Sequence, residues 1–255
     1  SDYDLSNREM TTLYAELKNQ PPNNDIMRSV LDSSDIDRGR GFDYLPGSKK
    51  EVETIGNMLS KQQWNVSLYT DKQATEAHFK NLSSQAPAVI HISTHGFYFP
   101  LVEKKESQKN IYKISENPLI RSGLLFTGAN NMWNSPESVT DQPEDGILTA
   151  YEISNLNLTN TQLAVLSACN TGKGEILNNE GTYGLQRAFR LAGVQSMIIT
   201  LWEISDSDTV IFMTEFYHHW TNGASLRNAF TTAQKKLKSM YPNQVEKWAG
   251  FVLVE

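Results

Sequence analysis

The chain has 255 residues, of which 39% are hydrophobic and 10% aromatic, and this is enough to bury one sizeable core. Its 23 basic and 29 acidic residues give a formal net charge of −6, and the basic residues are scattered, so the basic patch expected of a nucleic-acid-binding protein is missing. No apolar run approaches the roughly 18 residues that span a bilayer. The single cysteine excludes an intrachain disulfide framework and favours a reducing, cytoplasmic compartment.

The first 45 residues are polar, and we expect them to form a peripheral N-terminal arm with one helix over residues 5–19. From residue 46 to residue 255 the sequence alternates between helical and strand patterns, which predicts a single main domain.

The first part of this domain predicts a βαβ unit. Apolar residues at helical spacing predict a helix over residues 49–62, and a short strand is predicted over residues 65–70. A second helix, over residues 73–83, leads into 88-AVIHIST-94. Such a continuous apolar run is typical of a strand that is buried on both faces of a parallel sheet.

A long polar stretch over residues 100–145 then interrupts the pattern, and loops of this length in compact domains are usually functional or disordered. Beyond it, the alternation resumes with a strand, a helix and a strand, followed by two amphipathic helices and a closing strand. These elements are predicted over residues 163–168, 181–193, 196–202, 206–221, 225–239 and 251–255. Gly193 is expected to end its helix in the left-handed conformation. Together the elements predict an α/β fold with a mostly parallel central sheet covered on both faces.

Reactive side chains follow two of the predicted buried strands. His95 and Gly96 end the run 90-IHISTHG-96, and Cys169, the only cysteine, follows the run 163-LAVLSA-168. Ligands bind at the carboxyl ends of the strands in open α/β sheets. If the two strands are neighbours, the imidazole can take the thiol proton and the thiolate can attack a carbonyl carbon. Backbone N–H groups at Gly96 and Cys169 would then form an oxyanion hole.

Cys169 and His95 also allow other interpretations. A lone cysteine at a strand end is more often a small buried hydrophobe than a nucleophile, so the inference depends on the histidine. His91 and His95 also form a His-x-x-x-His pair, but they lie on a predicted strand, and Ile92 stands where the zinc-peptidase motif has glutamate. We therefore expect no metal and no organic cofactor. No third catalytic side chain is evident, so we expect backbone carbonyl groups to orient the imidazole.

Six segments of the chain match a known family. They are 90-IHISTHGF-97, 122-SGLLFTGAN-130, 145-DGILTAYEI-153, 163-LAVLSACNTGKG-174, 181-GTYGLQRAFRLAGVQSMIITLWEISD-206 and 225-SLRNAFTTAQ-234. These segments closely resemble the CHAT domain family, a group of caspase-like cysteine peptidases related to caspases and separases. In bacteria such domains commonly follow tetratricopeptide repeats. The resemblance extends from about residue 46 to the C-terminus.

The resemblance implies a caspase-like three-layer α/β/α sandwich and a cysteine endopeptidase that works through an acyl-enzyme. It makes His95 the catalytic histidine, Cys169 the nucleophile and His91 a second, non-catalytic histidine of the motif. It also implies a protein substrate, an activating or inhibiting protein partner or tetratricopeptide-repeat region, and a regulated role in bacterial signalling or defence.

CHAT domains usually carry strands upstream of the segment that begins near residue 41, so we expect this chain to be a fragment of a longer protein. The alternatives to a peptidase are a catalytically silent CHAT-type scaffold or sensor, and a different cysteine hydrolase or acyltransferase.

The segment around the nucleophile departs from the caspase pattern. Caspases carry Gln-Ala-Cys-Arg-Gly there, whereas this chain has 167-SACNT-171, so caspase-type aspartate specificity is not expected. Instead, 201-LWEISD-206 resembles a segment of separases, which cut after arginine. Asp206 or Glu203, with Asp145, is predicted to form a negative pocket for a lysine or arginine at P1, the residue before the cleaved bond. The predicted substrate-binding set also includes Trp202 and Ser167. The alternative is that Ser205 and Asp206 cap the helix that follows.

Overall fold

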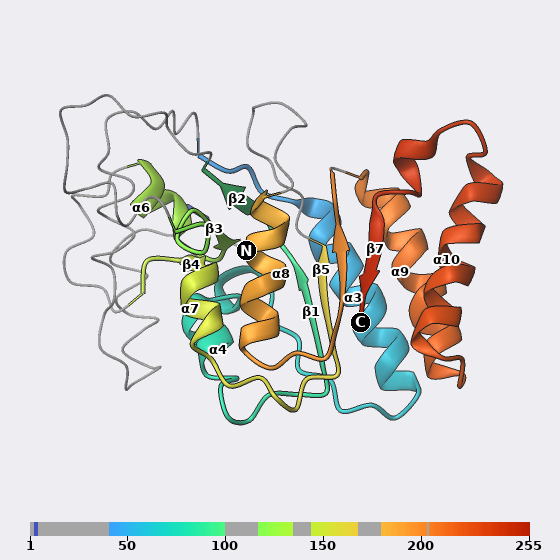
Figure 1. Ribbon diagram of the computed structural model, residues 1–255, viewed down its shortest axis with the longest axis horizontal. Helices are drawn as coiled ribbons and strands as arrows, with labels where there is room; N and C mark the ends of the chain where they lie inside the picture. The colour runs from blue at the N-terminus through green and yellow to red at the C-terminus, as the bar shows by residue number, and fades with distance from the viewer. Residues whose placement is uncertain (1–2, 5–40, 100–116, 135–143, 168–179, 203) are drawn as a thin grey trace.

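The computed structural model describes residues 3–4, 41–99, 117–134, 144–167, 180–202 and 204–255 (Figure 1). Their central sheet has four strands in the order β1-β5-β6-β7. Strands β1 (Val89–Ser93), β5 (Leu163–Ser167) and β6 (Ser196–Thr200) run parallel, and β7 (Phe251–Val254) pairs antiparallel with β6. The prediction of a mostly parallel central sheet is confirmed.

One face of this sheet is covered by α3 (Pro46–Lys61), α9 (Asp206–Thr221) and α10 (Leu226–Met240). Alternate residues of β5, Leu163 and Val165, join the apolar core on this side. Ile55 and Leu59 of α3 lie one helical turn apart and pack into the same core. All three helices were predicted, and their bounds differ from the expected ones by only a few residues.

The opposite face is covered by α8 (Glu180–Leu191) together with the short helices α4 (Glu76–Lys80) and α7 (Ala150–Ser154). The other alternate residues of β5, Ala164 and Leu166, point into this second core. Gly193 ends α8 with a φ of +101°, as predicted. The layers of helix, sheet and helix form the expected caspase-like α/β/α sandwich.

A second, antiparallel sheet lies beside the first and was not predicted. It consists of β2 (Gly96–Tyr98), β3 (Ser122–Leu125) and β4 (Ile147–Thr149), with α6 (Ala129–Asn134) packed against it. Gly123 is required there, because a Cβ atom would lie 2.4 Å from the carbonyl oxygen of Leu148. Residues 120–130 and 144–145 are buried in the structure, although they lie within the stretch 100–145 that the sequence pattern predicted as a long loop.

Residues 65–70, predicted as a strand, form no strand in the structure. They pair with no strand among the described residues, and Leu68 and Tyr69 are largely exposed. Val66 alone packs against the core beside α3. Two single 3₁₀ turns, at Asp71–Gln73 and Val245–Lys247, complete the described elements. The predicted helix over residues 5–19 lies outside the described residues.

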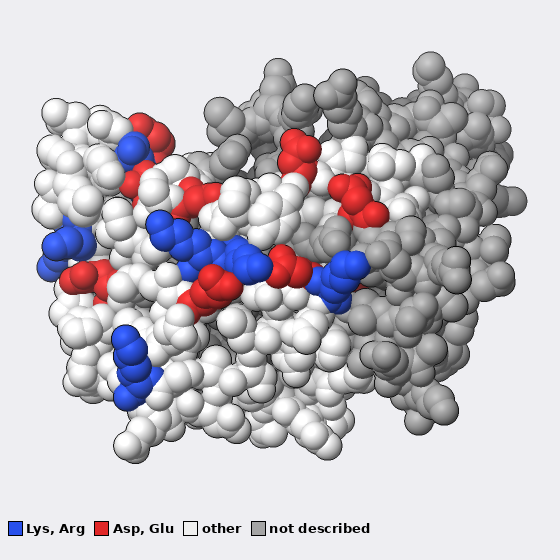
Figure 2. Space-filling model, turned by 180° about the vertical axis from the view of Figure 1, so that it is seen from behind, with Lys and Arg blue, Asp and Glu red and all other residues white. Residues whose placement is uncertain are grey.

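The surface of the described part of the chain carries both signs of charge. On the face shown in Figure 2, basic and acidic side chains are interspersed in a band across the middle. Among the described helices, none is both long enough and apolar enough to cross a membrane.

Candidate active site

The predicted catalytic strands are neighbours. β1 and β5 pair in parallel register, with Ser93 directly opposite Ser167. His95 comes two residues after Ser93, and Cys169 comes two residues after Ser167. The carboxyl ends of β1 and β5 therefore lie side by side, and in the sequence His95 follows the first strand and Cys169 follows the second. Cys169 itself lies outside the described residues.

The imidazole of His95 is held by a backbone carbonyl group. Its Nε2 atom lies 2.8 Å from the carbonyl oxygen of Asp43, in the segment that leads into α3. A carbonyl oxygen only accepts hydrogen bonds, so Nε2 must carry the proton, and in the neutral ring the lone pair is on Nδ1. Nδ1 is therefore the nitrogen that can act as a base. The expectation that a carbonyl orients this histidine is met.

Aromatic rings enclose the same histidine. The ring centroids of Tyr3 and Phe42 lie 5.4 and 5.3 Å from that of His95, which is only 5% exposed. The Tyr3 hydroxyl hydrogen-bonds to Thr94 Oγ1 at 2.8 Å and accepts a hydrogen bond from the His95 backbone N–H at 3.4 Å. Tyr3 is 3% exposed, so this residue of the predicted peripheral arm is part of the packing around the histidine.

The backbone after His95 is fixed by the antiparallel sheet. The His95 carbonyl oxygen accepts a hydrogen bond of 2.9 Å from Leu125 N–H, and Gly96 begins β2 opposite Leu124 of β3. Gly96 is buried at this position. An oxyanion hole made by the N–H groups of Gly96 and Cys169 stays a prediction.

Asp206 lies beside the first turn of α3, the helix that follows the segment around Asp43. It is the exposed first residue of α9, and its carboxylate rests against Gly47 in the first turn of α3, where an added Cβ atom would lie 1.8 Å from Oδ2. A carboxylate is favoured there by the partial positive charge of the helix N-terminus. Ser205 caps α9, because its Oγ atom accepts a hydrogen bond from Asp208 N–H, so the capping interpretation is confirmed for Ser205.

The other predicted substrate-binding residues that the structure describes make hydrogen bonds within the domain. Trp202 donates its indole N–H to the carbonyl oxygen of Glu246 at 2.7 Å. Ser167 donates its hydroxyl to Glu51 at 3.0 Å. Asp145 is buried and accepts a hydrogen bond of 2.8 Å from Ile147 N–H. Glu203 lies outside the described residues. A role of these residues in substrate binding therefore stays a prediction.

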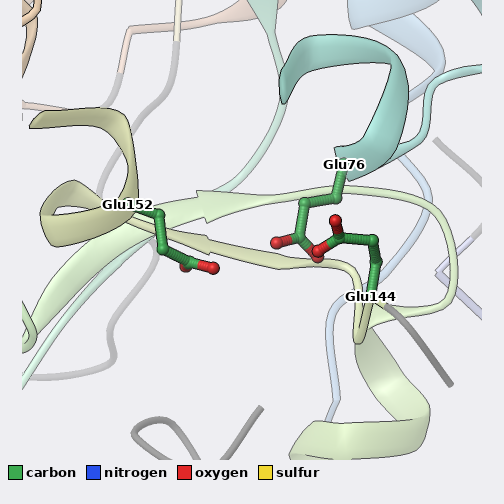
Figure 3. A group of neighbouring side chains, drawn as sticks. All are labelled: Glu76, Glu144 and Glu152. Atoms are coloured by element: carbon green, nitrogen blue, oxygen red, sulfur yellow. The ribbon is translucent and has the colours of Figure 1, made fainter. Parts of the chain in front are cut away.

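A buried cluster of charges joins α4 to the residues on either side of β4 and was not predicted from the sequence. The ammonium group of Lys80 lies 2.7 Å from Glu76, 2.5 Å from Glu144 and 2.8 Å from Glu152. Figure 3 shows the carboxyl groups of Glu76 and Glu144 turned toward one another, with Glu152 approaching from α7. The ligand atoms of the three glutamates lie within 4.8 Å of one another, close enough for a metal ion, but the Lys80 ammonium already occupies the place of the cation.

Burial raises the pKa of Glu76 and of neighbouring Asp145 well above their ordinary values, and raises that of Glu144 as well. Asp145 feels the charges of Glu76 and Glu152 in addition, so it belongs to this cluster. The Glu76–Lys80 pair at i,i+4 was visible in the sequence. Its two further partners come from distant segments that only the fold brings together.

The layered architecture is that of a caspase-like domain. A family model described as CHAT domain matches residues 3–255, and the chain belongs to this family. The match begins before the boundary at residue 46 that the sequence patterns suggested.

The chain is also similar to tetratricopeptide repeat protein 28 of two mammals. It is 32% identical to the Mus musculus protein over 228 residues, which cover 82% of this chain and 8% of that protein. It is 30% identical to the Homo sapiens protein over 121 residues, which cover 46% of this chain and 5% of that protein. The chain thus spans only a small part of these relatives.

Proposed function

We propose that this CHAT domain is a cysteine endopeptidase that cleaves a protein partner with His95 and Cys169. One observation carries the proposal: the strand that precedes His95 lies directly beside the strand that precedes Cys169, and the His95 ring is held with Nδ1 as its basic nitrogen. That arrangement serves nucleophilic catalysis by a thiol.

In this mechanism, Nδ1 of His95 removes the proton of the Cys169 thiol, and the thiolate attacks the carbonyl carbon of the scissile peptide bond. The resulting oxyanion is bound by the N–H groups of Gly96 and Cys169. As the C–N bond breaks, the His95 imidazolium gives its proton to the leaving amine, which leaves an acyl-enzyme. His95 then takes a proton from a water molecule, whose oxygen attacks the thioester carbonyl, and the acid product leaves as the thiol is reprotonated.

The expected preference is for lysine or arginine at P1, because Asp206 supplies an exposed carboxylate at the N-terminal ends of α3 and α9. The names of the relatives support a tetratricopeptide-repeat region as the neighbour or partner of this domain. The single cysteine supports a reducing compartment such as the cytoplasm. We place the domain in a regulated signalling or defence pathway on its resemblance to other CHAT proteins.

The proposal is tested by sequencing the new N-termini that the purified chain creates in a mixture of cell proteins, in parallel with the Cys169→Ala variant. Cleavages made only by the intact chain, and lost in His95→Ala, are expected. If both chains give the same N-termini and Cys169 alkylates at the rate of an ordinary thiol, the catalytically silent scaffold or sensor is the correct alternative.

A further inference from the structure

Glu51 is a buried acidic residue that lies under the ends of β1 and β5. It is on α3, faces the central sheet and is 3% exposed. Its Oε1 atom lies 3.0 Å from His91 Nε2, and its Oε2 atom accepts hydrogen bonds from Ser93 Oγ at 2.7 Å and Ser167 Oγ at 3.0 Å. One carboxylate thus connects α3 to both strands.

The hydrogen bonds around Glu51 extend through His91 to helix α9. Tyr217 of α9 lies 3.0 Å from His91 Nδ1, and burial raises the pKa of its phenol, which therefore keeps its proton. The Tyr217 phenol contacts one ring nitrogen of His91 and the Glu51 carboxylate contacts the other, so the imidazole links α9 to α3. With the two serine hydroxyls, the buried Glu51 carboxyl group has three hydrogen-bond partners.

The two serines are the last residues of their strands and are direct register partners. Because both donate to the same oxygen, the carboxylate holds the two strand ends together immediately before the chain continues to His95 and Cys169.

A buried carboxylate costs more free energy than an apolar side chain of similar size, so stability alone does not account for it. The rate of a catalysed reaction depends strongly on where the reacting groups lie, since a displacement of about 1 Å lowers it by about a hundredfold. On the basis of the proposed function, we infer that Glu51 is a positioning residue, which sets the relative placement of His95 and Cys169 through Ser93 and Ser167.

The inference is tested by measuring the rate at which iodoacetamide alkylates Cys169 as a function of pH, because this reaction needs no peptide substrate. Glu51→Gln keeps the size of the side chain but replaces one carboxyl oxygen by an amide nitrogen, which cannot accept a hydrogen bond. We expect its alkylation rate at neutral pH to fall about tenfold or more, with the pH midpoint moved toward the ordinary thiol value of about 8.5. Glu51→Asp should recover part of the rate. Glu53→Gln, on the exposed side of α3, is the matched control and should behave as the parent chain.

If Glu51→Gln fails to fold, the Ser93→Ala/Ser167→Ala double variant removes the same link while leaving the carboxylate and His91 in place, and the same shift is expected. A midpoint equal to that of the parent chain in a folded variant overturns the inference, even if the melting temperature falls. Failure of the proposed function gives a different result, in which the parent chain itself alkylates like an ordinary thiol and His95→Ala changes nothing.

Discussion

The Nε2 atom of His95 donates a hydrogen bond to the carbonyl oxygen of Asp43 over 2.8 Å. In the proposed reaction this carbonyl takes the part that a carboxylate plays in a Ser-His-Asp triad, because it fixes the orientation of the ring and the nitrogen that carries the proton. A carbonyl group does not titrate. The orientation of His95 through this bond should therefore persist over the whole pH range in which the domain is folded.

Removal of the Tyr3 hydroxyl should weaken the packing around His95. In Tyr3→Phe, the His95 backbone N–H and Thr94 Oγ1 lose their shared partner. We expect the free energy of unfolding to fall by about 1 kcal/mol, the usual contribution of one buried hydrogen bond. We also expect a lower rate of peptide cleavage. Urea unfolding and kinetics with a fixed substrate measure the two effects. Tyr44→Phe, which alters an exposed ring, is the control, and an equal effect of both variants would contradict the prediction.

Lys80 should be essential for stability. In Lys80→Met, three carboxyl groups lose their common cation in a buried site, and removing one partner of a buried ion pair costs about 3–5 kcal/mol. Urea unfolding at neutral pH measures the loss. Lys49→Met removes an exposed pair with Asp71 and is expected to change little. If the two variants are equally stable, the cluster does not depend on the Lys80 ammonium.

The stability of the domain should fall as the pH rises above about 4.5, because the pKa values of Glu76 and Asp145 are raised by burial. A carboxyl group with a raised pKa binds its proton more tightly in the folded state. Its contribution is complete below the unfolded pKa and is lost as the pH rises through the folded pKa, with a slope of about 1.4 kcal/mol per pH unit. Glu76→Gln removes one such group, so the slope of stability against pH above about pH 5 should be smaller in urea unfolding. Identical slopes in both chains would argue against a protonated Glu76.

Acid should destabilise the domain through other carboxyl groups. The hydrogen bond from Lys49 lowers the pKa of Asp71. Burial alone would raise the pKa of Asp208, but hydrogen bonds from Ser205, Tyr241 and Lys247 outweigh it and lower that pKa. A lowered pKa contributes stability above the unfolded value of about 4, and this contribution is lost as the pH falls through the folded value. Asp71 and Asp208 lose their contributions at lower pH than the range in which Glu76 loses its own. Glu76→Gln should therefore leave the loss of stability in acid unchanged.

Asp206 should set the preference for basic P1 residues. Asp206→Asn is expected to raise KM about tenfold for substrates with lysine or arginine at P1, as expected for the loss of one hydrogen bond to a charged group. Gly47→Ala should act in the same direction, because its new Cβ atom would meet the Asp206 carboxylate and push it aside. Substrates with leucine at P1 are the internal control. Equal changes in KM for substrates with basic and with apolar P1 residues would show that Asp206 is not part of the P1 pocket.

Much of the sandwich could be predicted from the chain. Strands β5 and β6 are mostly apolar and buried along nearly their whole length, and helices α8 and α10 carry apolar residues at helical spacing, so their local pattern and their burial agree. Strand β1 was expected to be buried on both faces, but its residues alternate between buried and partly buried. Residues 65–70 have the same local pattern as a strand but pair with none among the described residues. The antiparallel sheet was missed for the opposite reason: its strands are three or four residues long and include polar residues such as Ser122 and Thr149, which are buried.

The sequence by itself determined that a histidine and the single cysteine follow two apolar runs, because the types and order of the residues are written in the chain. It determined the family for the same reason. Only the tertiary structure decided which groups surround His95 and the two strand ends. The Asp43 carbonyl reaches His95 across 52 positions, and Glu51 reaches Ser167 across 116, so no local pattern relates them. Such contacts arise when helices pack on a sheet, and for that reason the groups that orient His95 and support the two strand ends appeared only with the fold.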